Sequence, residues 1–305
     1  MLPAGFYDLI FDEAKKSYED SNAAISLLIS EKYFLIKPPL IEFDSDYQTA
    51  SESDYFVTTD GVSGKKIALR SDITLQIRRI LATRLKNQEL PLKLCYVGDV
   101  IKAKSEDLYA DRQQTQIGFE IIGIQDDGAD FLIIKDLIDI LQKIKVKNFI
   151  FNVTLPNFLD VFLTEIKIEE QKSLKTAILQ KNLSKIAKIC PNYSDILQKI
   201  VRFNDDLPKI IAEIKQKIIS KEMNVELSRV QNIYEFFQKN YPNLEINFDL
   251  FGDKSSEYHC DIYFEILVPN FSYAIAKGGR YKIPNDDKDF IAVGATIYMN
   301  NLRKL

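Results

Sequence analysis

Two runs of alternating side chains decide the fold of this chain: LKLCYVGDVIKA at positions 92–103 and QTQIGFEIIGI at positions 114–124. Each run has the texture of a β-strand, with a side-chain period of two. A polar loop from Lys102 to Arg112 joins them. Two long strands joined in this way are most simply antiparallel neighbours.

The second run places polar residues on one face of its strand, because side chains two positions apart point the same way. The residues that share this face are Gln114, Gln116, Gly118 and Glu120. Amides, a carboxylate and a glycine are unlike a packed core, so this face meets either solvent or a polar pocket. Solvent is the more frequent environment for any one such strand.

Further elements are expected on both sides of these strands. Helical spacing of apolar residues predicts helices at residues 12–30, 72–86 and 129–144. The turn signal Asp60-Gly61 predicts a hairpin between residues 55–59 and 66–69. Other strands are predicted at residues 148–155, 244–250, 262–268 and 273–276, and a last apolar segment spans residues 290–299.

The texture of the sequence changes from about Pro156 to Asn240, a stretch rich in Lys, Glu, Ile and Leu that has no glycine. It predicts an all-helical insertion, residues 156–240, in a core domain made of residues 1–155 and 241–305. Strands on both sides of the insertion indicate one sheet that the C-terminal strands complete. The predicted fold class is α+β, an antiparallel sheet flanked by helices, rather than alternating βαβ units.

Composition argues against several classes of protein. The 305 residues carry a formal net charge of −4, which gives no electrostatic reason to expect nucleic acid. Three separated cysteines without a CxxC pair, and a single histidine, argue against a disulfide framework or a metal site. No signal segment opens the chain, and charges interrupt every apolar run before 18 residues. We therefore expect a soluble, cytoplasmic protein without a cofactor or a membrane partner.

Three further segments carry candidate chemistry: LRSDIT at 69–74, EYHCDIYFE at 257–265 and AKGGRY at 276–281. In the first, Asp72 and Thr74 are equally well understood as helix-capping residues. In the last, Gly278 and Gly279 allow a ligand to approach the backbone closely, although two glycines after a strand more often form only a turn.

In this order, with a helical insert before the last two, these segments resemble the catalytic core of histidyl-tRNA synthetase. The resemblance covers nearly the whole chain, from Leu2 to Gly294. The family's Arg-Pro-Glu-Gly-Thr resembles residues 70–74, and its motif 2 strand pair resembles residues 96–123. Its histidine-binding tyrosine region resembles residues 258–265, and its Gly-Gly-Arg-Tyr resembles residues 278–281. The resemblance implies the class II synthetase fold and a pocket for histidine.

The resemblance also implies which residues hold the ligand: Asp72, Thr74, Arg112, Gln116, Glu120, Tyr258, His259, Gly278 and Gly279. Asp72, Thr74 and Gln116 match positions that accept hydrogen bonds from the ammonium, and Glu120 matches the acceptor for an imidazole N–H. The two glycines would line the pocket floor.

Two of these residues, Arg112 and His259, also fit ordinary structural roles. Arg112 would reach a carboxylate or a phosphate, but it fits an exposed loop charge as well. Tyr258 matches the first tyrosine of the family's pair. His259 stands where the second is expected, and on its own it would more often be an ordinary strand residue.

Departures from the family bear on its chemistry. Lys102 replaces an arginine of motif 2, and Asn301 stands where motif 3 has another arginine. Each lost arginine contact in a desolvated site costs on the order of a few kcal/mol in the transition state, so two losses would abolish amino-acid activation. We therefore expect no catalytic residues. The sequence also has no room for an anticodon-binding domain after the core, so we do not expect the chain to bind tRNA.

This pattern is similar to a paralogous family, the regulatory subunits of ATP phosphoribosyltransferase. That resemblance implies a non-catalytic chain that activates a short catalytic subunit and conveys histidine feedback in the first step of histidine biosynthesis. It also implies a homodimer within a hetero-octamer.

Two alternatives stay open. One is a catalytic fragment of a histidine–tRNA ligase, and the other is a synthetase-like enzyme that forms an amide on another small molecule, which would need an intact ATP site.

Overall fold

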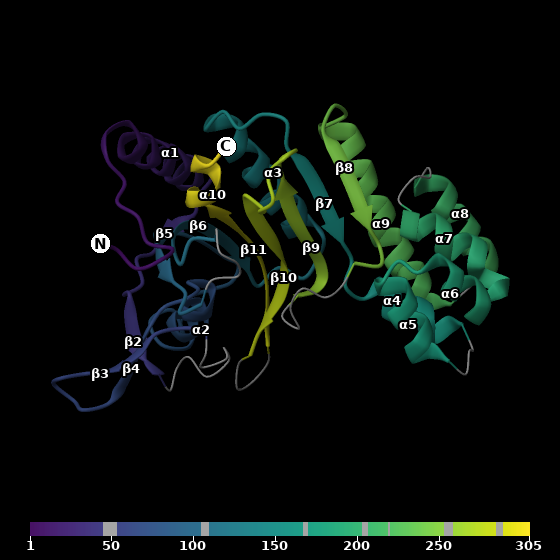
Figure 1. Cartoon of the computed structure of the whole chain (residues 1–305), viewed down its shortest axis with the longest axis horizontal. Coiled ribbons are helices and arrows are strands. Elements are labelled where there is room, and N and C mark those ends of the chain that lie inside the picture. The colour runs from purple at the N-terminus through teal and green to yellow at the C-terminus, as the bar shows by residue number, and fades with distance from the viewer. Residues whose placement is uncertain are drawn as a thin grey trace. The chain divides into compact units, whose positions relative to one another are not determined.

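The computed structural model describes residues 1–44, 54–104, 110–166, 170–202, 207–218, 220–252, 259–284 and 289–305. The chain divides into two compact units (Figure 1). The first contains residues 1–147, 271–277 and 283–305, and the second contains residues 148–270 and 278–282.

The first unit is built on the two strands that the sequence pattern predicted. Strands β5 (Leu92–Ile101) and β6 (Gln113–Ile122) pair antiparallel, which confirms the expectation. Strand β11 (Phe290–Tyr298) pairs antiparallel with the other edge of β6. The two-residue strand β1 (Phe34–Leu35) adds to β5 in the parallel direction, so the order is β1-β5-β6-β11. Strand β6 therefore has a strand on either side, and its side chains are fixed from both.

Helices cover this part of the sheet. Helix α1 (Phe11–Ser30) contacts β5 and β6, and α3 (Gly128–Lys143) contacts β6 and β11. Helix α3 buries an apolar stripe at helical spacing: Ile133, Ile134, Leu137, Ile138, Ile140 and Leu141. Each such side chain contributes roughly 1.5–3 kcal/mol when it leaves water, so this helix is a principal part of the core. The short helix α10 (Met299–Arg303) contacts α1 and β6.

A small separate sheet has the order β2-β4-β3, all antiparallel. It consists of β2 (Ile41–Phe43), β3 (Val57–Thr59) and β4 (Lys66–Leu69). The predicted hairpin is confirmed, and its turn is held by Asp60, whose carboxylate accepts from the backbone N–H of Ser63 at 3.0 Å. Hydrogen bonds from Ser63 lower the pKa of Asp60. Helix α2 (Thr74–Ala82) follows this sheet and is shorter than expected.

The second unit has its own strands. Strand β7 (Ile150–Thr154) pairs parallel with β8 (Glu245–Asp249) and antiparallel with β9 (His259–Leu267). Residues 278–282 of β10 (Ala276–Ile283) continue the order beyond β9. The prediction for β10 was wrong, because the strand begins at Ala276 rather than Tyr273, and its paired glycines lie inside the strand. Both glycines are buried, so the sheet sets their conformation rather than a turn.

Every element described between Phe158 and Asn240 is helical. These elements are α4 (Phe158–Glu165), α5 (Gln171–Leu179), α6 (Leu183–Ile189), a 3₁₀ turn (Pro191–Tyr193), α7 (Ser194–Arg202), α8 (Leu207–Lys217) and α9 (Lys221–Asn240). Side chains of Asn182 and Ser220 cap α6 and α9 by accepting backbone N–H groups at 3.0 Å. The compact unit that contains these helices also contains β7, β8 and β9, and the division into core and insertion stays a prediction.

The predicted α+β class is confirmed: the strands pair mostly antiparallel, and helices flank the sheet. The sequence pattern did not indicate the two parallel pairs. Both involve an edge strand, β1 or β8, whose five or fewer residues carry too short an alternation to assign a direction.

Candidate functional site

The polar face of β6 is buried. Gln114, Gln116 and Glu120 are 8%, 5% and 2% exposed. Of the two environments that the sequence pattern left open for this face, the structure excludes solvent. A buried carboxylate and buried amides are costly unless they have partners, so they mark a buried polar cluster in the first unit, which is the candidate ligand pocket.

Three oxygen atoms meet at the centre of this pocket. Thr74 Oγ1 lies 3.2 Å from Tyr96 Oη, and each of them lies 3.4 Å from Glu120 Oε1. Thr74 comes from the start of α2, Tyr96 from β5 and Glu120 from β6. Thus the segment 69–74 and the strand pair, which the sequence pattern singled out separately, do come together.

Two glycines make room for this cluster. Gly118 is the cross-strand partner of Tyr96, and a Cβ atom at Gly118 would collide with the tyrosine ring. Gly294 of β11 is the partner of Glu120, and a Cβ atom there would collide with the Glu120 carboxylate. Both side chains therefore lie over the backbone of a neighbouring strand, in space that only glycine leaves open.

Asp72 lies next to this cluster and has a local structural role. Its Oδ1 accepts the backbone N–H of Thr74, two residues on, at 2.8 Å, which forms an Asx-turn just before α2 rather than a helix cap, since the N-cap residue is Ile73. Burial raises the pKa of Asp72, although the hydrogen bonds from Thr74 and the nearby charge of Lys102 oppose this rise. Asp72 is thus held at the pocket by the turn that leads into α2.

Arg70 fixes the start of this segment. Its Nε donates to the carbonyl of Asp99 at 2.6 Å and its Nη1 to the carbonyl of Pro38 at 2.8 Å. Its guanidinium occupies the space over Gly98, where a Cβ atom would collide with it. These bonds tie the entry of α2 to β5, so Thr74 has a defined position relative to Tyr96.

The pocket is acidic. Burial raises the pKa of Tyr96 well above its usual value, and the neighbouring carboxylates of Glu120 and Asp72 raise it further. Two carboxylates thus act on one buried hydroxyl. The Oε1 atom of Gln116, on the same face of β6, is buried and has no hydrogen-bond partner in the described structure. Converging acceptor oxygens of this kind suit a ligand with N–H donors and positive charge.

Arg112 makes a different set of contacts. Its Nε and Nη2 donate to the carbonyls of Lys102 and Ala103 at 3.1 and 2.7 Å. Its guanidinium lies 5.2 and 5.1 Å from the ring centres of Phe6 and Phe56. In this arrangement Arg112 links the N-terminal segment to the end of the β5–β6 hairpin, and its predicted contact with a ligand stays a prediction.

The other predicted ligand residues belong to the second unit or lie outside the described residues. Tyr258 and the side chain of His259 are not among the described residues, and the backbone of His259 begins β9. Gly278 and Gly279 are buried in β10. Their predicted roles stay predictions.

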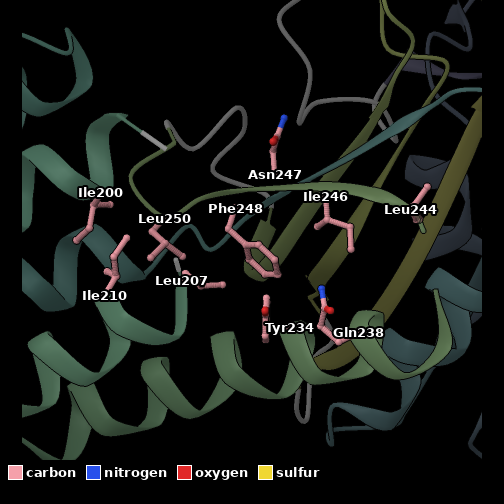
Figure 2. A pocket seen from close by; sticks show the side chains of 10 residues that line it. All are labelled: Ile200, Leu207, Ile210, Tyr234, Gln238, Leu244, Ile246, Asn247, Phe248 and Leu250. Carbon is pink, nitrogen blue, oxygen red and sulfur yellow. The ribbon is translucent and has the colours of Figure 1, made fainter. Parts of the chain in front are cut away.

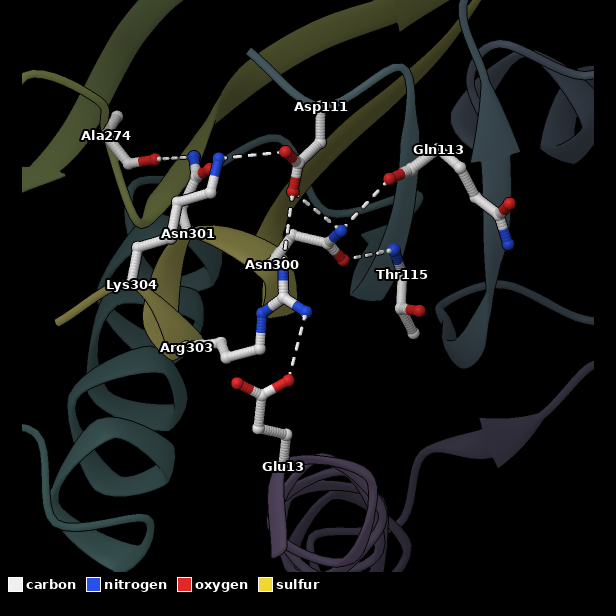
Figure 3. Close-up of polar contacts among 9 residues, drawn as sticks. All are labelled: Glu13, Asp111, Gln113, Thr115, Ala274, Asn300, Asn301, Arg303 and Lys304. Carbon is white, nitrogen blue, oxygen red and sulfur yellow. Dashed lines mark hydrogen bonds and ion pairs between the residues drawn. The ribbon is translucent and has the colours of Figure 1, made fainter. Parts of the chain in front are cut away.

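Asn301, at the position of the missing motif 3 arginine, has a structural partner. It is buried, and its Nδ2 donates to the carbonyl of Ala274 at 2.8 Å (Figure 3). Its neighbours hold the buried Asp111, which accepts from Asn300 Nδ2 and from Lys304 Nζ, both at 2.9 Å. The Arg303 guanidinium lies 3.7 Å from the same carboxylate. The polar groups of α10 are therefore used to anchor this helix to the strand pair.

A cavity of about 480 Å³ lies within the second unit (Figure 2). Figure 2 shows Ile246 and Phe248 of β8 pointing toward Tyr234 and Gln238 of α9. None of the residues that line it carries a charge, and none was predicted as a ligand residue. It is therefore not the pocket that the sequence pattern indicated.

The described residues contain no group of three His, Cys, Asp or Glu side chains placed to hold a metal ion. Within that same part of the chain, no helix has both the length and the apolar character needed to cross a membrane.

Tyr96 is a pocket residue that the strand pattern did not identify. The signal lay in the pairing register, because the antiparallel hairpin puts Tyr96 opposite a glycine on the polar face. Gly294 gave no local signal, since its partner Glu120 is far away in the sequence.

Comparison with known proteins agrees with this fold. The family model described as histidyl-tRNA synthetase matches residues 5–302. The ATP phosphoribosyltransferase regulatory subunit of Paramagnetospirillum magneticum is 28% identical over 308 residues, covering 99% of this chain and 80% of that protein. The protein of the same name from Thermoanaerobacter pseudethanolicus is 28% identical over 288 residues, covering 92% of this chain and 75% of that protein.

Solved structures share the fold. An ATP phosphoribosyltransferase regulatory subunit/histidyl-tRNA synthetase from Bacillus halodurans superposes with a TM-score of 0.83 at 20% identity, covering 100% of this chain and 82% of that one. A chain of the ATP phosphoribosyltransferase (HisG:HisZ) complex from Thermotoga maritima gives a TM-score of 0.69 at 17% identity, covering 93% and 97%. The match over nearly all of the sequence confirms the resemblance, and the chain belongs to the histidyl-tRNA synthetase family.

Proposed function

We propose that this chain is a non-catalytic regulatory subunit of ATP phosphoribosyltransferase. In this function it activates the short catalytic subunit and conveys feedback by histidine in the first step of histidine biosynthesis, in the cytoplasm. The observation that carries the proposal is the buried acidic pocket of Thr74, Tyr96 and Glu120, combined with Lys102 and Asn301 at the arginine positions. The names of the relatives from Paramagnetospirillum and Thermoanaerobacter support the same function.

The pocket chemistry supports binding of an amino acid without its activation. Acceptor oxygens suit an ammonium and an imidazole N–H, which histidine carries. Phosphate oxygens instead need fixed guanidinium groups, which hold them bidentately. In this chain Lys102 acts on Asp72, and Asn301 is bonded to a backbone carbonyl, so neither position offers a guanidinium.

Exposed apolar side chains support the proposed homodimer, with the hetero-octamer as the larger assembly. Phe11, Tyr18 and Phe34 are 85%, 70% and 66% exposed, and Leu35 and Ile41 are also exposed. Such a concentration on α1, β1 and β2 is typical of a surface that another chain covers. Light scattering of the purified protein would measure its mass, and a monomer at micromolar concentration would contradict this part of the proposal.

Reconstitution tests the function directly. Mixing the chain with a short-form ATP phosphoribosyltransferase should raise turnover, and added histidine should lower it again. The variant Glu120→Gln should keep the activation but weaken the histidine response, because it removes the buried charge with little change in shape. Glu89→Gln, an exposed position in the same unit, is the matched control. No gain in turnover on mixing would overturn the proposal.

The ligase alternative makes the opposite prediction. Histidine-dependent exchange of pyrophosphate into ATP would show amino-acid activation and would favour a histidine–tRNA ligase fragment. We expect calorimetry to detect binding of histidine and to detect no productive exchange with ATP.

A further inference from the structure

The hydroxyl of Tyr96 has a position that ligand contacts alone do not account for. Tyr96 is completely buried, and its ring lies over Gly118, so it cannot turn toward solvent without repacking the strand pair. Its Oη lies between Thr74 Oγ1 and Glu120 Oε1. A buried tyrosine hydroxyl in this position can donate its one proton in a hydrogen bond to only one of these two oxygens.

The order of donors in this cluster follows from the groups themselves. An ionised carboxylate only accepts, whereas each hydroxyl both donates and accepts. The phenolic O–H is more acidic than the threonine O–H and is the better donor to a carboxylate. Thr74 Oγ1 lies within hydrogen-bond distance of both Tyr96 Oη and Glu120 Oε1, and in the pair of hydroxyls either oxygen can be the donor. The proton of Tyr96 is therefore directed at Glu120.

We propose that Tyr96 is a positioning residue that orients the Glu120 carboxylate and keeps it ionised, and thereby makes the pocket selective for cationic ligand groups. The inference deepens the proposed histidine site and depends on that proposal for the ligand. Gly294 contributes by leaving space for the carboxylate on the side away from Tyr96. Groups that act on this carboxylate in the first unit include Thr74 and Tyr96 and, at longer range, Asp72 and Tyr33.

The test compares Tyr96→Phe with Tyr33→Phe. Tyr33 is also buried, and its hydroxyl donates to the carboxylate of Asp136 at 2.7 Å. It packs against Phe119, which points to the opposite face of β6 from Glu120. The two variants therefore remove the same group from a buried tyrosine–carboxylate pair, but Tyr96 is within hydrogen-bond distance of Glu120, whereas the neutral Tyr33 acts on it only at longer range.

Two measurements are made on each variant. In ligand-free protein, the carboxyl ¹³C signal of Glu120 should titrate about one pH unit higher in Tyr96→Phe, because loss of a donor disfavours the charged form. Calorimetry should show histidine affinity falling roughly 10- to 150-fold at neutral pH, as expected when one hydrogen bond to a charged group is lost. The loss should deepen as the pH is lowered. Tyr33→Phe should change neither quantity.

The outcomes separate this inference from the proposed function. An unchanged Glu120 titration in Tyr96→Phe would overturn the role of Tyr96, as would an equal shift in Tyr33→Phe. A shifted titration in a protein that does not bind histidine would leave Tyr96 as the positioning residue and would remove histidine as the ligand.

Discussion

Replacement of Gly294 by alanine should damage the pocket from a residue that no ligand needs to touch. Gly294 lies in the middle of β11, directly opposite Glu120. An added Cβ would overlap the Glu120 carboxylate and would lie 2.9 Å from the carbonyl oxygen of Phe119. The carbonyl belongs to a paired strand and cannot withdraw, so the carboxylate must move. The variant therefore tests whether the position of Glu120 determines binding.

The expected size of the effect follows from the contact that is lost. A hydrogen bond to a charged group contributes about 1.5–3 kcal/mol, so histidine affinity should fall roughly 10- to 150-fold. Overpacking at this site should also lower the free energy of unfolding by about 1–3 kcal/mol. Isothermal titration calorimetry measures the first quantity, and urea unfolding followed by circular dichroism measures the second.

The control for this experiment is Gly61→Ala. No heavy atom lies within 4 Å of a Cβ placed at Gly61, so this variant should change neither affinity nor stability. The reasoning is refuted if Gly294→Ala binds histidine as tightly as the unmodified protein does. If the variant is folded and its affinity for histidine falls by less than twofold, Glu120 can bind the ligand from another position.

Three other perturbations test the structure away from the ligand. Tyr33→Phe removes the donor to the buried Asp136 and should lower the free energy of unfolding by about 1–3 kcal/mol; a change below about 0.5 kcal/mol in urea unfolding would contradict this. Burial raises the pKa of the Asp136 carboxyl, so the folded protein binds a proton at Asp136 more tightly than the unfolded chain does. The folded protein therefore loses stability as the pH rises from the ordinary aspartate range through the raised pKa. Asp136→Asn should flatten that part of the stability–pH curve, and an unchanged slope would refute the assignment. Asp111→Asn weakens the anchor of α10 to Lys304 and Arg303, so hydrogen exchange of residues 299–303 should accelerate relative to α3, and equal protection would count against it.

Patterns within short stretches of sequence correctly predicted the helices and strand pairs that are formed by residues adjacent in the chain. The alternation in residues 92–103 and 114–124 predicted β5, β6 and their antiparallel pairing, because both strands and their loop are adjacent in the chain. The apolar spacing of α3 predicted a helix that begins and ends within one residue of the structure. The extent of β10 was wrong, since two glycines usually indicate a turn and only the flanking sheet keeps them extended.

The pocket was predicted less completely, because its geometry depends on register between distant strands. Glu120 and Gln116 followed from the polar face of one strand. Whether that face was buried could not be decided from β6 alone, since its burial requires the neighbouring strands. Tyr96 and Gly294 can be assigned to the pocket only when their cross-strand partners, Gly118 and Glu120, are known. Gly294 and Glu120 are far apart in the sequence, so no local pattern pairs them.

Under the proposed function, this strand pair would keep a ligand site in a core that has lost the chemistry of amino-acid activation. The proposed acceptors for the amino acid lie on the paired strands, where Gly118 and Gly294 leave room for Tyr96 and Glu120, so changes elsewhere in the core need not disturb them. The groups that would hold phosphates lie instead at the end of β5 and on α10. There the chain has Lys102 beside Asp72 and an asparagine bonded to Ala274, and neighbouring side chains of α10 are bonded to Asp111. Restoring one arginine alone, as in Asn301→Arg, would therefore bury a guanidinium in a site already filled by structural bonds, and it should destabilise the protein without creating ATP-dependent activation.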